Sequence, residues 1–177
     1  MSGKRYIHSL SVAEFSKKIA KFYSYNTEKA YIAGLLHDCA RDMKIDELKK
    51  IALKCGIKIG EIEKYHPILL HAPVGAYIAK EEFGIVDREI LQAIASHTIL
   101  NENPTLLDKI LYIADLAEPK RDFKEAELVR KQTFLNIDKA VILCTDITFR
   151  YLINEHKMIH PVTLFARNSL IKEVYYG

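Results

Sequence analysis

The sequence predicts an all-α protein built as a single domain, and three observations support that prediction. Hydrophobic side chains recur every three to four residues along most of the 177-residue chain, which is the spacing of one helix face. Gly (7) and Pro (5) are scarce, which argues against a loop-rich β-sandwich and against disorder. The composition is 49% hydrophobic and 28% charged, and at ~150 residues per domain this length predicts one domain.

The first two helices are expected on either side of a polar turn. In residues 9–25, Val12 and Ile19 share one face at helical spacing. Asn26 stands where an N-cap is expected, because its side chain can accept hydrogen bonds from the first free amides of a helix. The apolar run that follows extends to Asp38, so a strongly hydrophobic helix is expected to end beside a carboxylate.

Two further helical segments are expected in the middle of the chain. Asp46 is the expected N-cap of a short helix that ends before Gly56. Pro67 and Pro73 bracket the start of the next segment, which ends at Gly84.

The second half of the chain continues the helical pattern. Asp87 is expected to cap one helix, and Thr105 with Asp108 resembles a capping box in which Asp replaces the usual Glu or Gln. The helix that this box opens should end before Pro119. Residues 118–134 are the most polar stretch and predict a loop with a short helix. The last two helices are expected over residues 138–156 and 163–176.

Several classes of protein are disfavoured by composition. Cys39, Cys55 and Cys144 are odd in number, far apart and without a Cys-x-x-Cys pair, so a reducing compartment, the cytoplasm, is expected. The N-terminus leads into no long apolar stretch, and the apolar runs are short, so neither a signal peptide nor a membrane span is expected. A net charge of +3 is too small to indicate nucleic-acid binding, although it suits a local phosphate pocket.

Histidines and aspartates interrupt the apolar helices at four places in the sequence. A buried carboxylate is costly unless it is paired, hydrogen-bonded or bound to a metal. A lone imidazole on an apolar face is usually a hydrogen-bonded core residue, and a single aspartate can cap a helix. The occurrence of all six side chains beside apolar helices is what indicates a site. The side chains, in chain order, are His8, His37, Asp38, His71, His97 and Asp115.

Imidazole and carboxylate together predict a metal site. His37 and Asp38 point about 100° apart on a helix, but both can reach an ion that lies beyond the helix end. His8 and Asp115 would come from helices packed alongside, as in the metal sites of helical bundles. With no thiolate nearby the ligand set is borderline to hard, so iron, manganese, cobalt and zinc all suit it.

Six segments around these positions recur in order along the chain. They are Arg5-x-x-His8-Ser9, Gly34-Leu35-Leu36-His37-Asp38, Leu70-His71-Ala72-x-Val74-Gly75-Ala76, Ala93-Ile94-x-x-His97-Thr98, Ala114-Asp115-x-x-Glu118-Pro119-x-Arg121 and Pro161-x-Thr163-Leu164-x-x-Arg167-Asn168. Together they resemble the HD-domain metal-dependent phosphohydrolases, and more narrowly the bacterial YqeK-type HD proteins. That resemblance implies symmetrical hydrolysis of diadenosine tetraphosphate to two ADP. After Thr98 the family often has a Thr-Gly pair, whereas this chain has Ile99-Leu100.

The resemblance also implies roles for individual residues. It implies one domain over 1–177, with a metal core at about 5–121 and C-terminal helices, 138–177, that complete a nucleotide pocket. Iron is the implied metal, as one ion or two, and its implied ligands are His8, His37, Asp38 and Asp115. The implied catalytic residues are Asp38, His71, His97 and Arg121. The implied nucleotide contacts are Ser11, Asp38, His71, His97, Thr98, Asp115, Arg121, Met158, Ile159, His160, Pro161, Val162 and Thr163.

Some roles stay open on the sequence alone. His71 and His97 suit phosphate ligands and proton donors, or ligands of a second metal ion. Arg121 suits stabilisation of transition-state charge, because a guanidinium fork matches phosphate oxygens. The competing hypotheses are another HD-type nucleotide phosphohydrolase or phosphodiesterase and a non-catalytic nucleotide-binding helical protein. A small-molecule nucleotide is the expected partner, and the ten tyrosines suit a homodimer interface as well as a core.

Overall fold

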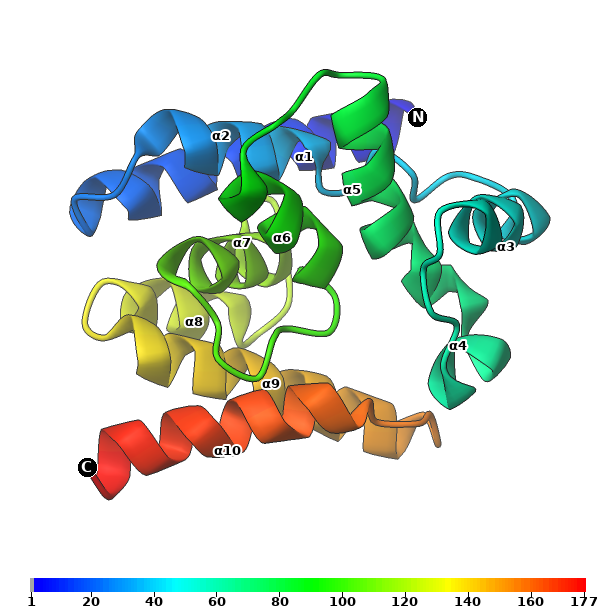
Figure 1. Cartoon of the computed structure of the whole chain (residues 1–177). Helices are drawn as coiled ribbons and strands as arrows, with labels where there is room; N and C mark the ends of the chain where they lie inside the picture. The colour runs from blue at the N-terminus through cyan, green and yellow to red at the C-terminus, as the bar shows by residue number, and fades with distance from the viewer. Residues whose placement is uncertain (1) are drawn as a thin grey trace.

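The computed structural model describes residues 2–177, and within that range it contains helices and no strand (Figure 1). The predicted all-α class is therefore confirmed. The helices are α1 (Gly3–Phe22), α2 (Thr27–Leu36), α3 (Ile45–Lys54), α4 (Glu61–Tyr65), the 3-10 turn η1 (Pro67–Leu70), α5 (His71–Glu81), α6 (Arg88–Ser96), α7 (Leu106–Ala117), α8 (Ala126–Thr133), α9 (Ile137–Asn154) and α10 (Pro161–Tyr175).

Three predicted helix starts are confirmed by their capping geometry. The Asn26 side chain accepts from the first amides of α2, and the Asp87 side chain does the same for α6. At the start of α7, Thr105 Oγ1 accepts from the amide of Asp108, while the Asp108 carboxylate accepts from the amide of Thr105. These caps satisfy amides that have no partner within the helix, so local sequence fixes where each helix begins.

Other boundaries differ from the expectation. Helix α1 begins at Gly3, because Ser2 caps it, so His8 lies inside the helix and not before it. The N-cap of α3 is Lys44 and not the predicted Asp46, so the helix begins two residues earlier, at Ile45. Asp46 lies in its first turn, where a negative charge interacts favourably with the helix dipole. Helix α10 begins at Pro161, since the fixed φ of proline suits the first helical position.

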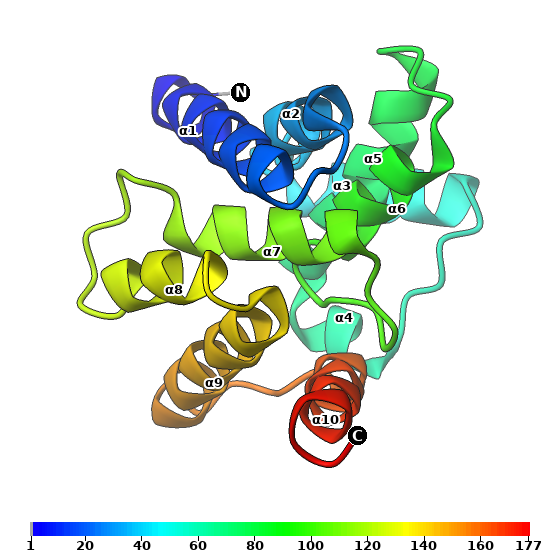
Figure 2. The same cartoon turned by 90° about the vertical axis from the view of Figure 1, so that its left-hand side faces the viewer.

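Helix α7 is the centre of the molecule. It packs against α1, α2, α6, α8 and α9, and Figure 2 shows it crossing between the α1–α2 pair and the C-terminal helices. Its sequence is apolar nearly all round, as expected for a helix with neighbours on every side, and Leu107, Ile110, Leu111 and Ile113 are fully buried. Any polar group on α7 therefore needs a partner from another element.

Helices α1 and α2 run antiparallel and approach each other closely (Figure 1). Gly34 allows this approach, because a Cβ atom there would lie 2.7 Å from Ala13 Cα. The contact brings the end of α2, and with it His37, alongside the His8 turn of α1. A bulkier residue at position 34 would separate the two helices.

The remaining elements form the flanks. Helices α9 and α10 pack together on the other side of α7, and α3 packs on α5 and η1 around a smaller apolar cluster that includes Leu48 and Val74. No helix within residues 2–177 has the length and hydrophobicity needed to cross a membrane.

Candidate metal centre

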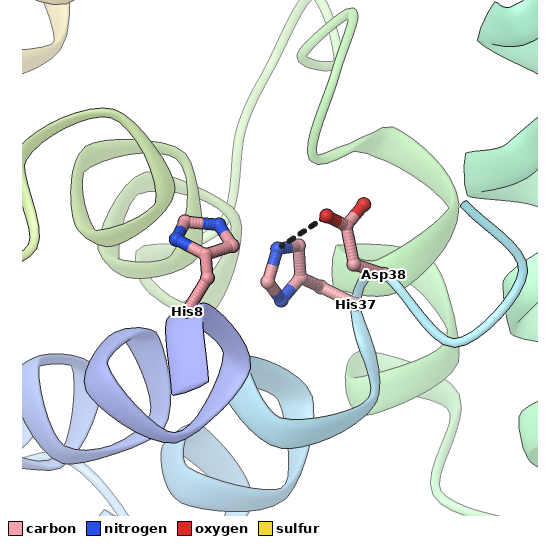
Figure 3. Close-up of side chains that lie close together, drawn as sticks. All are labelled: His8, His37 and Asp38. Carbon is pink, nitrogen blue, oxygen red and sulfur yellow. Dashed lines mark ion pairs between the residues drawn. The ribbon is translucent and has the colours of Figure 1, made fainter. Parts of the chain in front are cut away.

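Five helices meet at one point and bring the six predicted side chains together. His8 projects from α1, and the other five lie at or near helix termini. His37 is the C-cap of α2 and Asp38 follows it, His71 begins α5, His97 is the C-cap of α6, and Asp115 is in the last turn of α7. Figure 3 shows the His8 and His37 rings next to each other, with Asp38 beside His37, and the two rings meet edge to face.

Asp38 is the buried carboxylate of the cluster. Its Oδ1 lies 3.2 Å from His71 Nε2 and 3.7 Å from His97 Nε2, and its Oδ2 lies 3.6 Å from His37 Nε2. Burial alone would raise the pKa of Asp38, but hydrogen bonds with His71 and His97 and the charge of His37 lower that pKa below its usual range. Asp38 is therefore an ionised carboxylate at neutral pH.

Asp115 supplies the second carboxylate. Its Oδ1 lies 2.9 Å from His8 Nε2 and 3.6 Å from His37 Nε2, so His37 lies between the two aspartates. Burial would raise the pKa of Asp115, whereas the neighbouring imidazoles of His37 and His8 lower it. Its side chain is 28% exposed, so the burial expected from the apolar run around it is incomplete. Asp115 is therefore the more exposed of the two carboxylates.

Three of the histidines have their tautomer set in the same way. Each ring donates its Nδ1–H to a backbone carbonyl three residues earlier, so in the neutral imidazole the Nε2 lone pair is directed into the cluster. The Nδ1–O distances are 2.7 Å from His37 to Gly34, 2.6 Å from His71 to Ile68 and 2.8 Å from His97 to Ile94.

This arrangement of lone pairs fits a bound cation. His71 Nε2 and His97 Nε2 lie 3.1 Å apart with acceptors facing each other, and the buried His37 Nε2 has no hydrogen-bond partner within residues 2–177. Arg5 and Arg121 are donors at the edge of the cluster, but most of its groups are acceptors, and such a convergence is unfavourable unless a positive charge lies among them. The groups of three side chains with ligand atoms within 4.8 Å of one another are His8, His37 and Asp38; His37, His97 and Asp115; and Asp38, His71 and His97.

Two arginines lie at the edge of the cluster. Arg121 donates from Nε to the Asp115 carbonyl at 3.2 Å and from a terminal nitrogen to Asp115 Oδ1 at 3.4 Å, and its side chain is 44% exposed. Arg5 contacts Asp38 Oδ2 at 2.5 Å and Asp42 Oδ1 at 3.0 Å. The sequence did not single out Arg5 as a site residue, although its spacing of three residues from His8 places both on one helix face.

Ser11 and Glu118 form a layer behind His8. Ser11 Oγ donates to Glu118 Oε2 at 2.5 Å, and Glu118 Oε1 lies 3.2 Å from His8 Nδ1. The structure thus places Ser11 on a buried glutamate and not at the surface of the cluster. Glu118 is a residue that sequence reasoning missed, and its only signal was its place beside Pro119 in the Asp115-to-Arg121 motif.

A cavity of about 330 Å³ adjoins the cluster at Thr98, whose Oγ1 lies 3.4 Å from His71 Nε2. From the predicted segment 158–163, Met158, His160 and Thr163 line this cavity, and Thr163 donates a hydrogen bond to the Ile99 carbonyl. Val162 lines a neighbouring cavity, and Pro161 is exposed. Arg41, Ile68, Phe149, Tyr151 and Lys157 are among the other lining residues.

The Ile99-Leu100 pair, which stands where the family often has Thr-Gly, lies beside this cavity, and Ile99 lines it. Leu100 has a φ of 60°, in the left-handed region that favours glycine, and yet its side chain is fully buried. The backbone therefore has the conformation that a glycine would adopt freely, while the leucine contributes to the core.

Fold and cluster together define an all-α protein with a histidine–aspartate cluster that is able to bind a metal ion. The HD domain family matches residues 5–119, and the chain belongs to that family. HD domain hydrolases are metal-dependent.

Relatives of known name match almost the whole chain. The symmetrical bis(5'-nucleosyl)-tetraphosphatase of Halalkalibacterium halodurans is 37% identical over 96% of this chain and 90% of its own length. The enzyme of the same name from Bacillus subtilis is 34% identical over 94% of this chain and 89% of its own length. A crystal structure from Clostridium acetobutylicum, described as a predicted HD superfamily hydrolase involved in NAD metabolism, is 38% identical, with a TM-score of 0.95 over 98% of this chain and 92% of that one.

Proposed function

We propose that this protein is a metal-dependent symmetrical bis(5'-nucleosyl)-tetraphosphatase that hydrolyses diadenosine tetraphosphate to two ADP. The observation that supports the reaction class is the convergence of His8, His37, Asp38 and Asp115, in which His37 Nε2 lies 3.6 Å from each carboxylate and His8 Nε2 lies 2.9 Å from Asp115 Oδ1. Relatives with that name, matched over nearly their full length, support the substrate.

The four side chains His8, His37, Asp38 and Asp115 would hold the metal, and iron is the ion that we propose. When bound, the cation lowers the pKa of a water molecule and offsets charge on the phosphoryl oxygens. The protein's part in phosphoryl transfer is mainly positioning and electrostatic stabilisation. The hydrogen bond from His37 Nδ1–H to the Gly34 carbonyl supplies such positioning, because the imidazole ring cannot rotate without losing it.

His71 and His97 would bind the phosphate chain and hold the proton that the departing ADP requires. Their Nε2 atoms lie 3.1 Å apart and both reach Asp38 Oδ1, so one shared proton is well placed between them. Arg121 would contact the phosphoryl oxygens, since its guanidinium is half exposed beside Asp115 and free to turn toward a substrate. Thr98 would donate a hydrogen bond to the same chain.

The cavity beside Thr98 would take one nucleoside. Its lining combines Phe149, Met158 and Ile68 with the polar groups of His160 and Thr163, a mixture of apolar walls and a few hydrogen-bonding groups that is typical of small-molecule sites. If one ADP half binds there, the central phosphoanhydride bridge reaches the metal ligands and cleavage is symmetrical. The C-terminal helices 138–177 then complete the pocket on the metal core 5–121.

Cell compartment and assembly are the remaining parts of the proposal. The three cysteines are free, which fits a reducing compartment, and we place the protein in the cytoplasm. Exposed apolar side chains such as Ile153 and Phe165 on α9 and α10 would suit a homodimer contact.

Product analysis tests the proposal. The purified protein, loaded with Fe²⁺ without oxygen, is expected to convert diadenosine tetraphosphate to ADP as the only product, measured by ion-exchange chromatography. Asp38→Ala should lose both metal content and hydrolysis, whereas the matched control Asp46→Ala, at an exposed position of α3, should keep both. ATP with AMP as products, or a preference for nucleoside triphosphates or cyclic dinucleotides, would overturn the proposed substrate. Nucleotide binding without turnover would overturn the enzymatic role.

A further inference from the structure

Glu118 is a buried carboxylate for which the proposed reaction has no use. It is 3% exposed, and buried glutamates are rare unless they are paired. Burial would raise the pKa of Glu118, but hydrogen bonds from Ser11, the Lys120 amide and His8 lower it, so the group is ionised at neutral pH. Its position follows from the local sequence.

Pro119 determines the backbone at Glu118. Helix α7 ends at Ala117, and Glu118 has φ −53° and ψ 153°, the extended conformation that the residue before a proline prefers. Arg130 donates to the carbonyl of Ala117 at 3.2 Å and so satisfies the end of the helix. The result is that Glu118 turns toward α1, three residues after the metal-ligand candidate Asp115.

The two carboxylate oxygens of Glu118 have different partners. Oε2 accepts from Ser11 Oγ at 2.5 Å and from the Lys120 amide at 2.6 Å. Oε1 faces His8 Nδ1 at 3.2 Å. Two donors therefore fix the carboxylate, and its free oxygen is directed at one ring nitrogen of His8.

His8 needs such a partner because of where it stands. The other three histidines donate their Nδ1–H to the backbone carbonyl three residues earlier, which lies near the end of α2 or α6 or in the turn before α5. His8 is in the interior of α1, where the backbone carbonyls are engaged in the helix. A side chain from another element must then set its ring, and Glu118 is the group that reaches it.

We propose that Glu118 is a positioning residue that orients His8 and strengthens it as a metal ligand. Donation of Nδ1–H to Glu118 leaves the His8 Nε2 lone pair facing Asp115 Oδ1 at 2.9 Å, which is favourable with a cation between them. An anionic partner also makes the imidazole a better electron donor than a carbonyl would. The inference rests on the metal site of the proposed function, and it adds a residue and its role to that site.

The test is metal affinity measured in the absence of nucleotide. Apo protein is titrated with Co²⁺, followed by visible absorption, and with Mn²⁺, and the unfolding midpoint of each apo variant is recorded. Glu118→Gln is expected to raise the metal dissociation constant roughly 10- to 100-fold. Its carbonyl oxygen can serve His8 or the Ser11 and Lys120 donors, but not both. Ser11→Ala is expected to raise the constant several-fold, because it frees the carboxylate to move.

A matched control is Glu127→Gln, since Glu127 pairs with Lys131 at 2.7 Å on the exposed face of α8. It should leave metal affinity unchanged. Unchanged affinity in Glu118→Gln, or an unfolding midpoint that drops while affinity holds, would overturn the inference and leave the metal site intact. If Glu118→Gln fails to fold, the metal affinity of Ser11→Ala tests the inference by itself, and an unchanged affinity overturns it. Absence of metal binding by the wild-type protein would overturn the proposed function as well.

Discussion

Helix α7 has one aspartate near each end, and the two differ in the partners that they meet. Asp108, at the start, is buried and accepts hydrogen bonds from Gln92, Ser96 and Thr105. Asp115, near the end, faces the Nε2 atoms of His8 and His37. Both follow apolar residues on the same helix, so their sequence surroundings are alike.

The difference lies in donors and acceptors. Asp108 is surrounded by hydrogen-bond donors of Gln92, Ser96 and Thr105, so the protein alone satisfies its carboxylate. Asp115 joins a set of groups that mostly accept, and Arg121 is its only cationic side-chain partner in the described part of the chain. A carboxylate that has all its hydrogen-bond donors stabilises the fold. A carboxylate that lies among other acceptors is stabilised by binding a cation. The comparison predicts opposite outcomes for substitutions at the two positions.

The largest effect is expected for Asp115→Asn. Loss of the carboxylate removes a metal ligand, so metal content should fall and turnover should drop by roughly 10²-fold or more, the range for loss of one electrostatic group in an active site. The free energy of unfolding of the apo protein should change by less than about 1 kcal/mol, because the partly exposed pair with Arg121 contributes little. Metal analysis and urea unfolding of the metal-free protein measure the two effects. A large loss of apo stability would place Asp115 among the structural residues.

Asp108→Ala should show the reverse. It removes the capping box of α7 and leaves the donors of Gln92 and Thr105 without an acceptor, so the free energy of unfolding should fall by about 2 to 3 kcal/mol. Metal content and turnover of the folded fraction should stay normal. Asp108→Asn is the matched variant, since an amide oxygen can keep the Thr105 bonds and should cost less. Equal losses in both variants would show that the charge itself is required.

A smaller effect, on the pH dependence of stability, is expected at Asp87. This residue is the N-cap of α6 and contacts neither Asp108 nor Asp115. A hydrogen bond from Lys29 lowers the pKa of Asp87. The folded state therefore favours the ionised form, so the stabilisation is complete above the ordinary aspartate pKa of about 4 and is lost as pH falls through the lowered value. Asp87→Asn, which keeps a capping side chain, should flatten the decline of the unfolding midpoint below about pH 4. Thermal unfolding of apo protein from pH 7 to pH 3 tests this, and parallel curves would exclude the ion pair as a contributor.

Local sequence was sufficient to predict most of the fold. Asn26, Asp87 and Thr105 fix helix starts through bonds within three residues, and the apolar run before Asp115 predicts a central helix. The predicted starts of α1 and α3 were wrong. Ser2 caps α1 well before the expected start, and α3 begins after Lys44, whose amide donates to the Glu47 side chain.

The sequence by itself determined the residue types of the site, since histidine and aspartate beside apolar runs need a partner wherever they lie. The tertiary structure decided which partner each side chain meets. The sequence separated Asp108, as a capping-box residue, from Asp115. It did not reveal the roles of Arg5 and Glu118, because their partners lie more than 30 residues away in the chain, Asp38 for Arg5 and His8 for Glu118. The hydrogen-bond partners of each side chain depend on which helix ends lie together. The helix ends are brought together by packing contacts such as that of Gly34 with Ala13.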